Sequence, residues 1–202
     1  RPFTVYTTAP FAGRRGVFLQ ACADVIATQL EELTAEWAPD ELGNYRAVFE
    51  EGIDFSVERM VTALIFLSEN ELAGERLQVA WDTKDQENEH SCFSDTTCQD
   101  NIFDATGMLN VWRGEYVQTG GKRLTGPGLR DICLEVKPDL EPVITALLEG
   151  NVARAKAIPA PFDQAIQGSD DTPGRKAVMA LITSLEDTGV ELRKLARALH
   201  IE

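Results

Sequence analysis

Apolar side chains recur along most of the chain at steps of three and four residues, the spacing of an amphipathic α-helix. The first such stripe consists of Cys22, Val25 or Ile26, Leu30, Leu33 and Trp37. It predicts a long helix that ends before Pro39, because proline lacks the N–H donor and clashes with the preceding turn. Similar stripes predict a short helix around residues 45–49 and longer helices over about 53–81, 96–116, 129–158 and 172–199.

The breaks between these stripes define the expected architecture. Lys137-Pro138 interrupts one predicted helix, and Thr172-Pro173 begins the last one, with threonine as N-cap and proline at the first position. The segment TGGKRLTGPG, residues 119–128, is predicted to be a loop. No segment shows strand alternation bounded by hairpin turns. We therefore predict an all-α helical bundle of four long antiparallel helices with short extra helices, forming one domain over residues 1–202.

Charge narrows the possible partners. The 202 residues carry a formal net charge of −14, whereas nucleic acids and anionic membranes are bound through basic patches. We therefore expect no nucleic-acid partner. The chain opens with Arg-Pro instead of an initiator Met, so we expect a processed or excised piece.

The densest group of reactive side chains is ENEHSCFSDTTCQD, residues 87–100. It holds one of the two histidines, His90, two of the four cysteines, Cys92 and Cys98, and four carboxylates. A structural zinc site would use closer cysteine spacing, and the acidic residues before His90 lack the pattern of an EF-hand. A Cys92 nucleophile with His90 as its base has no visible oxyanion hole. The remaining interpretation is an acidic loop whose Ser94 or Asp95 caps the next helix.

Capping has a second candidate in the same segment. Thr96 and Gln99 have the spacing of a capping box, in which a hydroxyl and an amide each satisfy one free backbone N–H. Phe93 and Cys92 are residue types that favour burial, so we expect the end of the loop to be fixed against the bundle.

Several longer strings resemble one known family. DTKDQENEHSCFSD, preceded by ELAGERLQVAWDT and followed by NVWRGEY, is similar to the imelysin-like proteins, the peptidase M75 group of bacterial iron-regulated proteins. The opening RPFTVYTT and the later PAPFDQAI are also similar to that family, so the resemblance covers nearly the whole chain.

The resemblance implies a fold of two helical bundles, with this chain matching the second. It also implies export, as a periplasmic protein or a membrane-anchored lipoprotein, and a link to iron uptake. A metallopeptidase activity is assigned to some members. The family's Gly-x-His-x-x-Glu motif, which belongs to the first bundle, does not occur in this sequence. The family's loop typically continues SDNTH, whereas this chain reads SDTTC, with Cys98 in place of histidine.

From the resemblance we expect Glu89, His90, Ser91 and Asp95 to line a cleft shared with the N-terminal bundle. His90 and Glu89 are the candidate metal ligands, because imidazole and carboxylate suit both iron and zinc. The expected partners are that bundle, in the same chain or as a separate one, and iron-uptake components of the cell envelope.

Four cysteines allow three complete pairings, among which spacing alone does not choose. Export would place the chain in an oxidising compartment. We predict a disulfide between Cys98 and Cys133, because both lie near the beginnings of predicted helices.

Three functions remain in competition. The leading hypothesis is a binding role in iron uptake. The alternatives are a metallopeptidase that is active only with its N-terminal half, and a non-catalytic protein-interaction module.

Overall fold

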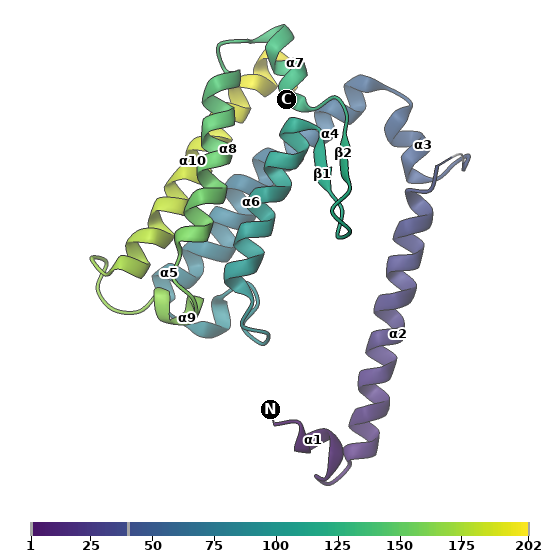
Figure 1. Cartoon of the computed structure of the whole chain (residues 1–202), viewed down its shortest axis with the longest axis vertical. Coiled ribbons are helices and arrows are strands. Elements are labelled where there is room, and N and C mark those ends of the chain that lie inside the picture. Colours follow the sequence, from purple (N-terminus) through teal and green to yellow (C-terminus); the bar gives the residue numbers. More distant parts are fainter. Residues whose placement is uncertain (1, 40, 202) are drawn as a thin grey trace. The chain divides into compact units, whose positions relative to one another are not determined.

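The computed structural model describes residues 2–39 and 41–201 and divides the chain into two compact units, Arg1–Ser56 and Val57–Glu202. Nearly all of the regular structure is helical (Figure 1), which confirms the predicted all-α class. The hydrophobic pattern predicts one domain and contains no signal for a division at residue 56. Helix α4 (Ile53–Phe66) continues through the boundary between the two units.

The first unit consists of α1 (Thr4–Thr7), α2 (Ala12–Glu36), α3 (Tyr45–Glu50) and the first turn of α4. Asn44 joins two of these helices. Its side chain accepts a hydrogen bond from the amide of Ala47 at the start of α3 and donates to the carbonyl groups of Ala35, in the last turn of α2, and Ala38, just beyond it. The chain therefore turns there with its free backbone groups satisfied.

The apolar stripe of α2 is exposed. Its predicted members Val25, Ile26, Leu30 and Leu33 are each more than half exposed, and none of the described side chains of α2 is buried. The stripe correctly predicts the helix, but the first unit supplies no partner for it.

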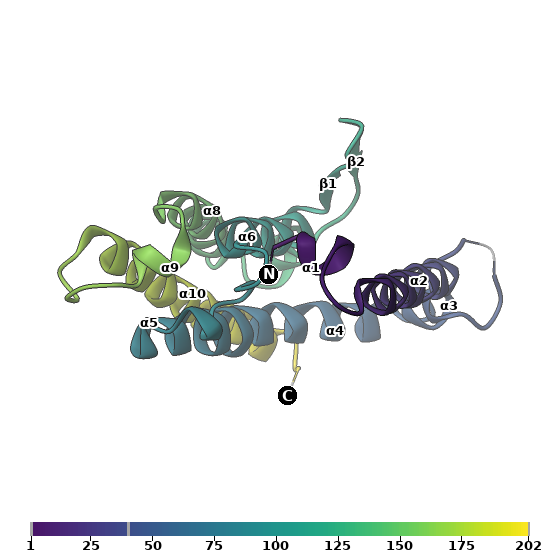
Figure 2. The same ribbon diagram turned by 90° about the horizontal axis from the view of Figure 1, so that it is seen from below.

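The second unit is a bundle of long helices. One continuous helical segment runs from α4 through η1 (Leu67–Gln78) into α5 (Val79–Thr83), and the others are α6 (Thr97–Arg113), α8 (Glu141–Ala157) and α10 (Pro173–Ala198). Helix α10 packs against both η1 and α8, and α6 packs against α8 (Figures 1 and 2). The predicted start of the last helix is confirmed, with Thr172 as N-cap and Pro173 in the first turn.

A single hydrophobic core fills this bundle. Every long helix contributes fully buried side chains, among them Leu72, Leu77, Trp112, Ile144, Leu148, Leu181, Leu185 and Leu192. The indole of Trp112 also donates a hydrogen bond of 2.8 Å to Thr145, which fixes α6 against α8.

The predicted helix over 53–81 is present, but its middle is a π-helix. Residues Leu67–Gln78 adopt this wider form, which is rare and occurs frequently at functional sites. The buried positions of η1 are Ser68, Leu72, Ala73 and Leu77, so the inward side recurs every four to five residues. The Ser68 hydroxyl donates to the carbonyl of Leu185 on α10 at 2.9 Å.

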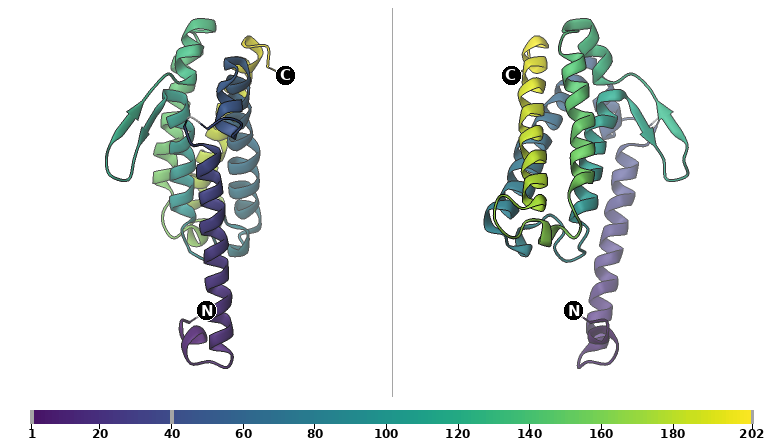
Figure 3. Two further views of the ribbon diagram at one scale, coloured as in Figure 1. Left: turned by 90° about the vertical axis from the view of Figure 1, so that its right-hand side faces the viewer. Right: turned by 60° about the vertical axis from the view of Figure 1, so that its left-hand side comes forward.

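The predicted helix over 96–116 is too long, and part of the expected loop is a β-hairpin. Helix α6 ends at Arg113, where Gly114 has φ +64°. Strands β1 (Glu115–Val117) and β2 (Arg123–Thr125) then pair antiparallel and project from the bundle (Figure 3). The Gly-Gly pair at 120–121 is a hairpin signal that the sequence analysis took for an irregular loop.

Short elements complete the second unit: η2 (Gln86–Asn88), α7 (Leu129–Val136) and α9 (Phe162–Ala165). The predicted interruption at Lys137-Pro138 separates α7 from α8, as expected. Of the helices that the structure describes, none combines the length and apolarity needed to cross a membrane.

The predicted disulfide between Cys98 and Cys133 is wrong for this structure, in which both thiols are free and buried. Cys98 lies in the first turn of α6. Cys133 belongs to α7, whose N-terminal Gly128 approaches the backbone of Trp112 at the other end of α6. A helix of that length spans about 25 Å, whereas a disulfide needs α-carbons within about 7 Å.

Candidate functional site

The loop between α5 and α6 is fixed at its first residues. Lys84, with φ +56°, ends α5 and donates from Nζ to the carbonyl of Gly168 at 2.6 Å. Gln167 donates back to the carbonyl of Lys84 at 2.9 Å. The Asp85 carboxylate then accepts from the amide of Glu87 and begins η2. The loop is thereby held against the segment between α9 and α10.

Glu89 turns into the protein. It is 5% exposed, and neither oxygen of its carboxylate has a hydrogen-bond partner of good geometry among the described residues. Burial raises the pKa of the Glu89 carboxyl. The nearby carboxylates of Asp163 and Asp95 raise this pKa further, whereas the Thr97 side chain lowers it. A buried carboxyl in this state is ready to accept a cation, a proton or a hydrogen bond.

His90 lies on a different side of the loop. Glu89 has an extended backbone, in which successive side chains point in opposite directions. The Nδ1 atom of His90 is buried without a hydrogen-bond partner in the described chain and lies 3.8 Å from Oδ2 of Asp104 on α6. Glu89 is affected instead by Thr97, Asp163 and Asp95, so the two candidate ligands have different polar neighbours.

Asp104 connects His90 to the π-helix. Burial raises the pKa of the Asp104 carboxyl; His90 and Arg76 oppose this shift, and the carboxylates of Asp100 and Glu71 add to it. Arg76 is held by Glu71 through two hydrogen bonds of 2.9 and 2.6 Å. The imidazole thus faces a cluster of charged groups that come from η1 and α6.

Two more buried polar side chains on α6 lack partners. Asn101 is fully buried, and both its amide nitrogen and its amide oxygen are without a hydrogen bond. One carboxylate oxygen of Asp100 is in the same state. Across residues 2–39 and 41–201, the unpartnered buried side-chain atoms all belong to Glu89, His90, Asp100 and Asn101. Such groups are uncommon in proteins, and their occurrence within one short stretch, residues 89–101, marks a candidate site.

The apex of the loop differs from the prediction. Ser91 is half-buried, its amide donates to the Thr97 hydroxyl at 3.0 Å, and its carbonyl accepts from the amide of Asp95 at 2.9 Å. Asp95 is exposed with φ +58°, and neither Ser94 nor Asp95 is the N-cap of α6. The N-cap is Thr96, as the capping-box prediction has it, but its side chain makes no capping bond. The expected burial of Phe93 is also wrong, because its ring is 94% exposed.

The His90 side of the loop fits part of a metal site. An imidazole nitrogen without a partner and a carboxylate at 3.8 Å are two ligand types that iron and zinc accept. In the part of the chain that the structure describes, no three His, Cys, Asp or Glu side chains converge to hold an ion. His90 and Asp104 would therefore supply one side of a site.

Sequence reasoning missed Asp104, Asp100, Asn101, Glu71 and Arg76. A usable signal was present for two of them: Asp100 and Asp104 are four residues apart on a predicted helix that directly follows the loop, so they share one face. Nothing in the sequence pattern indicates that the π-helix brings Glu71 and Arg76 to that face.

Comparison with known proteins supplies the identity. No curated protein matches the chain as a relative. The model of one protein family, imelysin or peptidase M75, matches residues 2–192, which is nearly the full length. This agrees with the resemblance seen in the loop sequence, and the chain belongs to the imelysin family.

Proposed function

We propose that this chain is the C-terminal bundle of an exported imelysin-family protein that serves bacterial iron uptake. In this proposal the loop of residues 89–95 and the adjacent face of α6 line a cleft shared with an N-terminal bundle. The observation that carries the proposal is the concentration of unpartnered buried polar atoms on Glu89, His90, Asp100 and Asn101. Buried polar groups without partners lower stability, so these side chains support a role in binding.

His90 and Asp104 are the side chains that contact iron or zinc in this proposal. The ion would supply Lewis acidity and charge, and the remaining ligands would come from the other bundle. Arg76, which is held by Glu71, attracts the carboxylate of Asp104, and Glu89 holds the loop from its inner side. The exposed ring of Phe93 at the loop apex supports contact with a partner, because large apolar side chains are mostly buried in monomers.

The test compares the two histidines of the chain in the full-length protein. His90→Ala should lower the iron or zinc retained after dialysis by at least about tenfold. His200→Ala is the matched control, because His200 is exposed at the end of α10 and distant in sequence from the loop. Equal metal content in both variants would contradict the proposal.

The same preparations separate the alternatives. Peptidase activity that is abolished by a chelator and by His90→Ala would show a metallopeptidase whose active site needs both bundles. Absence of retained metal in the wild-type protein, together with binding to an envelope partner that Phe93→Ser abolishes, would show an interaction module.

A further inference from the structure

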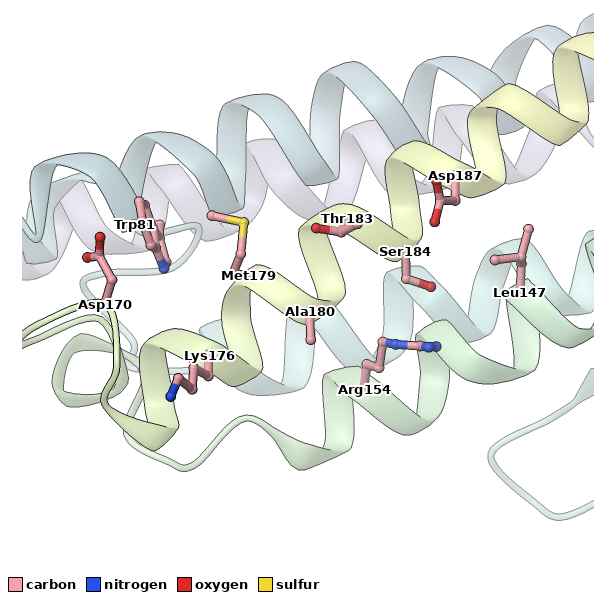
Figure 4. A pocket seen from close by; sticks show the side chains of 10 residues that line it. All are labelled: Trp81, Leu147, Arg154, Asp170, Lys176, Met179, Ala180, Thr183, Ser184 and Asp187. Carbon is pink, nitrogen blue, oxygen red and sulfur yellow. The ribbon is translucent and has the colours of Figure 1, made fainter.

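A groove in the second unit shares no lining residue with the loop of residues 89–95 and runs between α8 and α10, with Trp81 of α5 at one end (Figure 4). Its volume is about 610 Å³, within the range of ligand pockets. It follows α10 from Lys176 to Asp187, which is about 16 Å at the rise of an α-helix.

The Trp81 end of the groove is held rigidly by Arg175, whose side chain is 2% exposed. The guanidinium lies 3.8 Å from the centre of the Trp81 ring and donates to the carbonyl groups of Trp81 and Ile166 at 2.7 and 2.8 Å. It also donates twice to Oδ1 of Asp170, at 2.8 and 3.1 Å. The other oxygen of Asp170 stays available on an exposed side chain that lines the groove.

The middle of the groove is mainly apolar, and its wall is held by a hydrogen bond inside the bundle. Met179, Ala180 and Thr183 of α10 line it, whereas Leu147 of α8 lies at the end away from Trp81 (Figure 4). The Ser184 hydroxyl at its wall is already bonded to Asn151, at 2.5 Å, inside the bundle. A bound molecule would therefore meet mainly apolar contacts there, beside the exposed side chain of Thr183.

The opposite end carries a guanidinium without a protein partner. Arg154 of α8 points along the groove toward Leu147 (Figure 4). In the described residues it forms no hydrogen bond or ion pair, although the chain has an excess of acids. Gly150 gives it room, because a β-carbon at residue 150 would collide with the guanidinium of Arg154. Glycine is unfavourable inside a helix. At position 150 its lack of a β-carbon leaves the space in which the guanidinium lies against α8.

We propose that this groove binds a short apolar peptide with a free C-terminus. The terminal carboxylate pairs with Arg154, which can hold it through two parallel hydrogen bonds. Apolar side chains lie over Met179 and Ala180, the last of them reaches Leu147 beside Arg154, and the terminal ammonium meets the free oxygen of Asp170. Four or five extended residues span about the same length as the groove.

Asp187 limits the negative charge that a ligand can carry at this end of the groove. Its carboxylate lies at the same end as Arg154 and lines the groove from α10 (Figure 4). It repels a doubly charged anion such as phosphate more strongly than a single carboxylate. This site is separate from His90, so His90→Ala should leave peptide binding unchanged, and the two proposals can fail independently.

The test is calorimetric titration of the chain with the tetrapeptide Leu-Ala-Leu-Leu as free acid, as C-terminal amide and as N-acetylated acid. The free acid should bind in about the millimolar range or tighter. The amide should bind at least about tenfold more weakly, because it loses the charge-assisted contact with Arg154. The acetylated acid should bind with an intermediate affinity, and inorganic phosphate should not compete.

Variants locate the binding. Arg154→Gln should remove the preference for acid over amide, and Gly150→Ala should reduce it by displacing the guanidinium, with helix content unchanged. Lys156→Gln and Glu186→Gln, at exposed neighbouring positions outside the groove lining, are the matched controls and should behave as wild type. The proposal is overturned by equal binding of acid and amide, by no binding of the free acid at 10 mM (about ten times the expected constant), or by an acid preference that survives Arg154→Gln.

Discussion

Asn101 on α6 and Asn151 on α8 are both fully buried, and their helices pack against each other. Asn151 is completely engaged: its amide nitrogen donates to Thr188 at 2.8 Å, and its oxygen accepts from Ser184 at 2.5 Å. Asn101 has no hydrogen-bond partner among the described residues on either atom. Two side chains of one type thus occupy opposite states in one bundle.

The same contrast separates the buried charged groups. Arg175 is enclosed by four hydrogen bonds and an aromatic ring, whereas Glu89 is buried with no partner of good geometry in the described chain. A satisfied buried group stabilises the fold, and an unsatisfied one lowers its stability. The difference teaches that the buried polar groups of α8 and α10 stabilise the fold, while the buried polar groups on and beside α6 stay unsatisfied and can be used by a ligand or partner.

The largest expected effect on stability is at Arg175, a buried side chain whose hydrogen bonds are all formed within the protein. Arg175→Met should lower the free energy of unfolding by about 3–5 kcal/mol, because it leaves the carbonyl groups of Trp81 and Ile166 without donors. Arg154→Met is the control, since its exposed guanidinium has no protein partner in the described chain, and it should change stability by less than about 0.5 kcal/mol. Chemical denaturation of both variants measures the difference, and equal losses would show that the Arg175 contacts are not specific.

Asn151→Leu should lower the free energy of unfolding by about 1–3 kcal/mol. The substitution keeps the approximate volume but leaves the Ser184 hydroxyl without its acceptor and removes the donor from which the Thr188 hydroxyl accepts. Urea unfolding of this variant, followed by circular dichroism, gives the value, and a gain in stability would mean that the network contributes nothing.

Asn101→Leu should have the opposite sign and raise the free energy of unfolding by about 1–2 kcal/mol. The substitution removes a buried amide that has no partner in the described chain and replaces it with an apolar side chain of similar size. The same urea experiment applies. Destabilisation comparable to that of Asn151→Leu would show that Asn101 is satisfied and would abolish the comparison.

A smaller, pH-dependent effect is expected at Glu89. Its pKa is raised above the ordinary value of 4.5, so the folded protein holds this proton more tightly than the unfolded chain. Ionisation therefore lowers stability as the pH rises from about 4.5 through the raised pKa, and below about 4.5 no such loss remains.

Glu89→Gln does not titrate, so its stability relative to wild type should be greater at pH 7 than at pH 4.5. Thermal unfolding at the two pH values checks this. Asp104 also has a raised pKa but is present in both proteins, so it acts as an internal background. A difference that is the same at both pH values would contradict the assignment.

Periodicity predicted the helices of the second unit well, because burial follows side-chain spacing: Leu181, Leu185 and Leu192 of α10 are fully buried, as expected. It did not reveal that the comparable stripe of α2 would stay exposed, since spacing does not specify a partner. The hairpin was missed because Tyr116 continued the helical spacing past Gly114, where a positive φ ends α6.

The candidate site was predicted only in part. His90 was identified from its residue type, and Glu89 was expected to line the same cleft. The backbone at Glu89 is extended, and successive side chains of an extended backbone point in opposite directions. The groups that face His90 come from α6 and η1, and only packing brings those elements to the loop. Asp95 does not cap α6, because Asp95 itself has a left-handed backbone and lies one residue before the N-cap, Thr96.

The central claim is that the α6 side of the bundle keeps polar groups unsatisfied for binding. The most direct test is the melting temperature of the full-length protein with and without added Zn²⁺ or Fe²⁺, in wild type and in His90→Ala. A ligand that binds only the folded state raises its stability by about 2.7 kcal/mol at a hundredfold excess over the dissociation constant. We predict a rise of several degrees in wild type, little rise in His90→Ala, and similar melting temperatures for both proteins without metal. An equal rise in both proteins, or no rise in wild type, would contradict the claim.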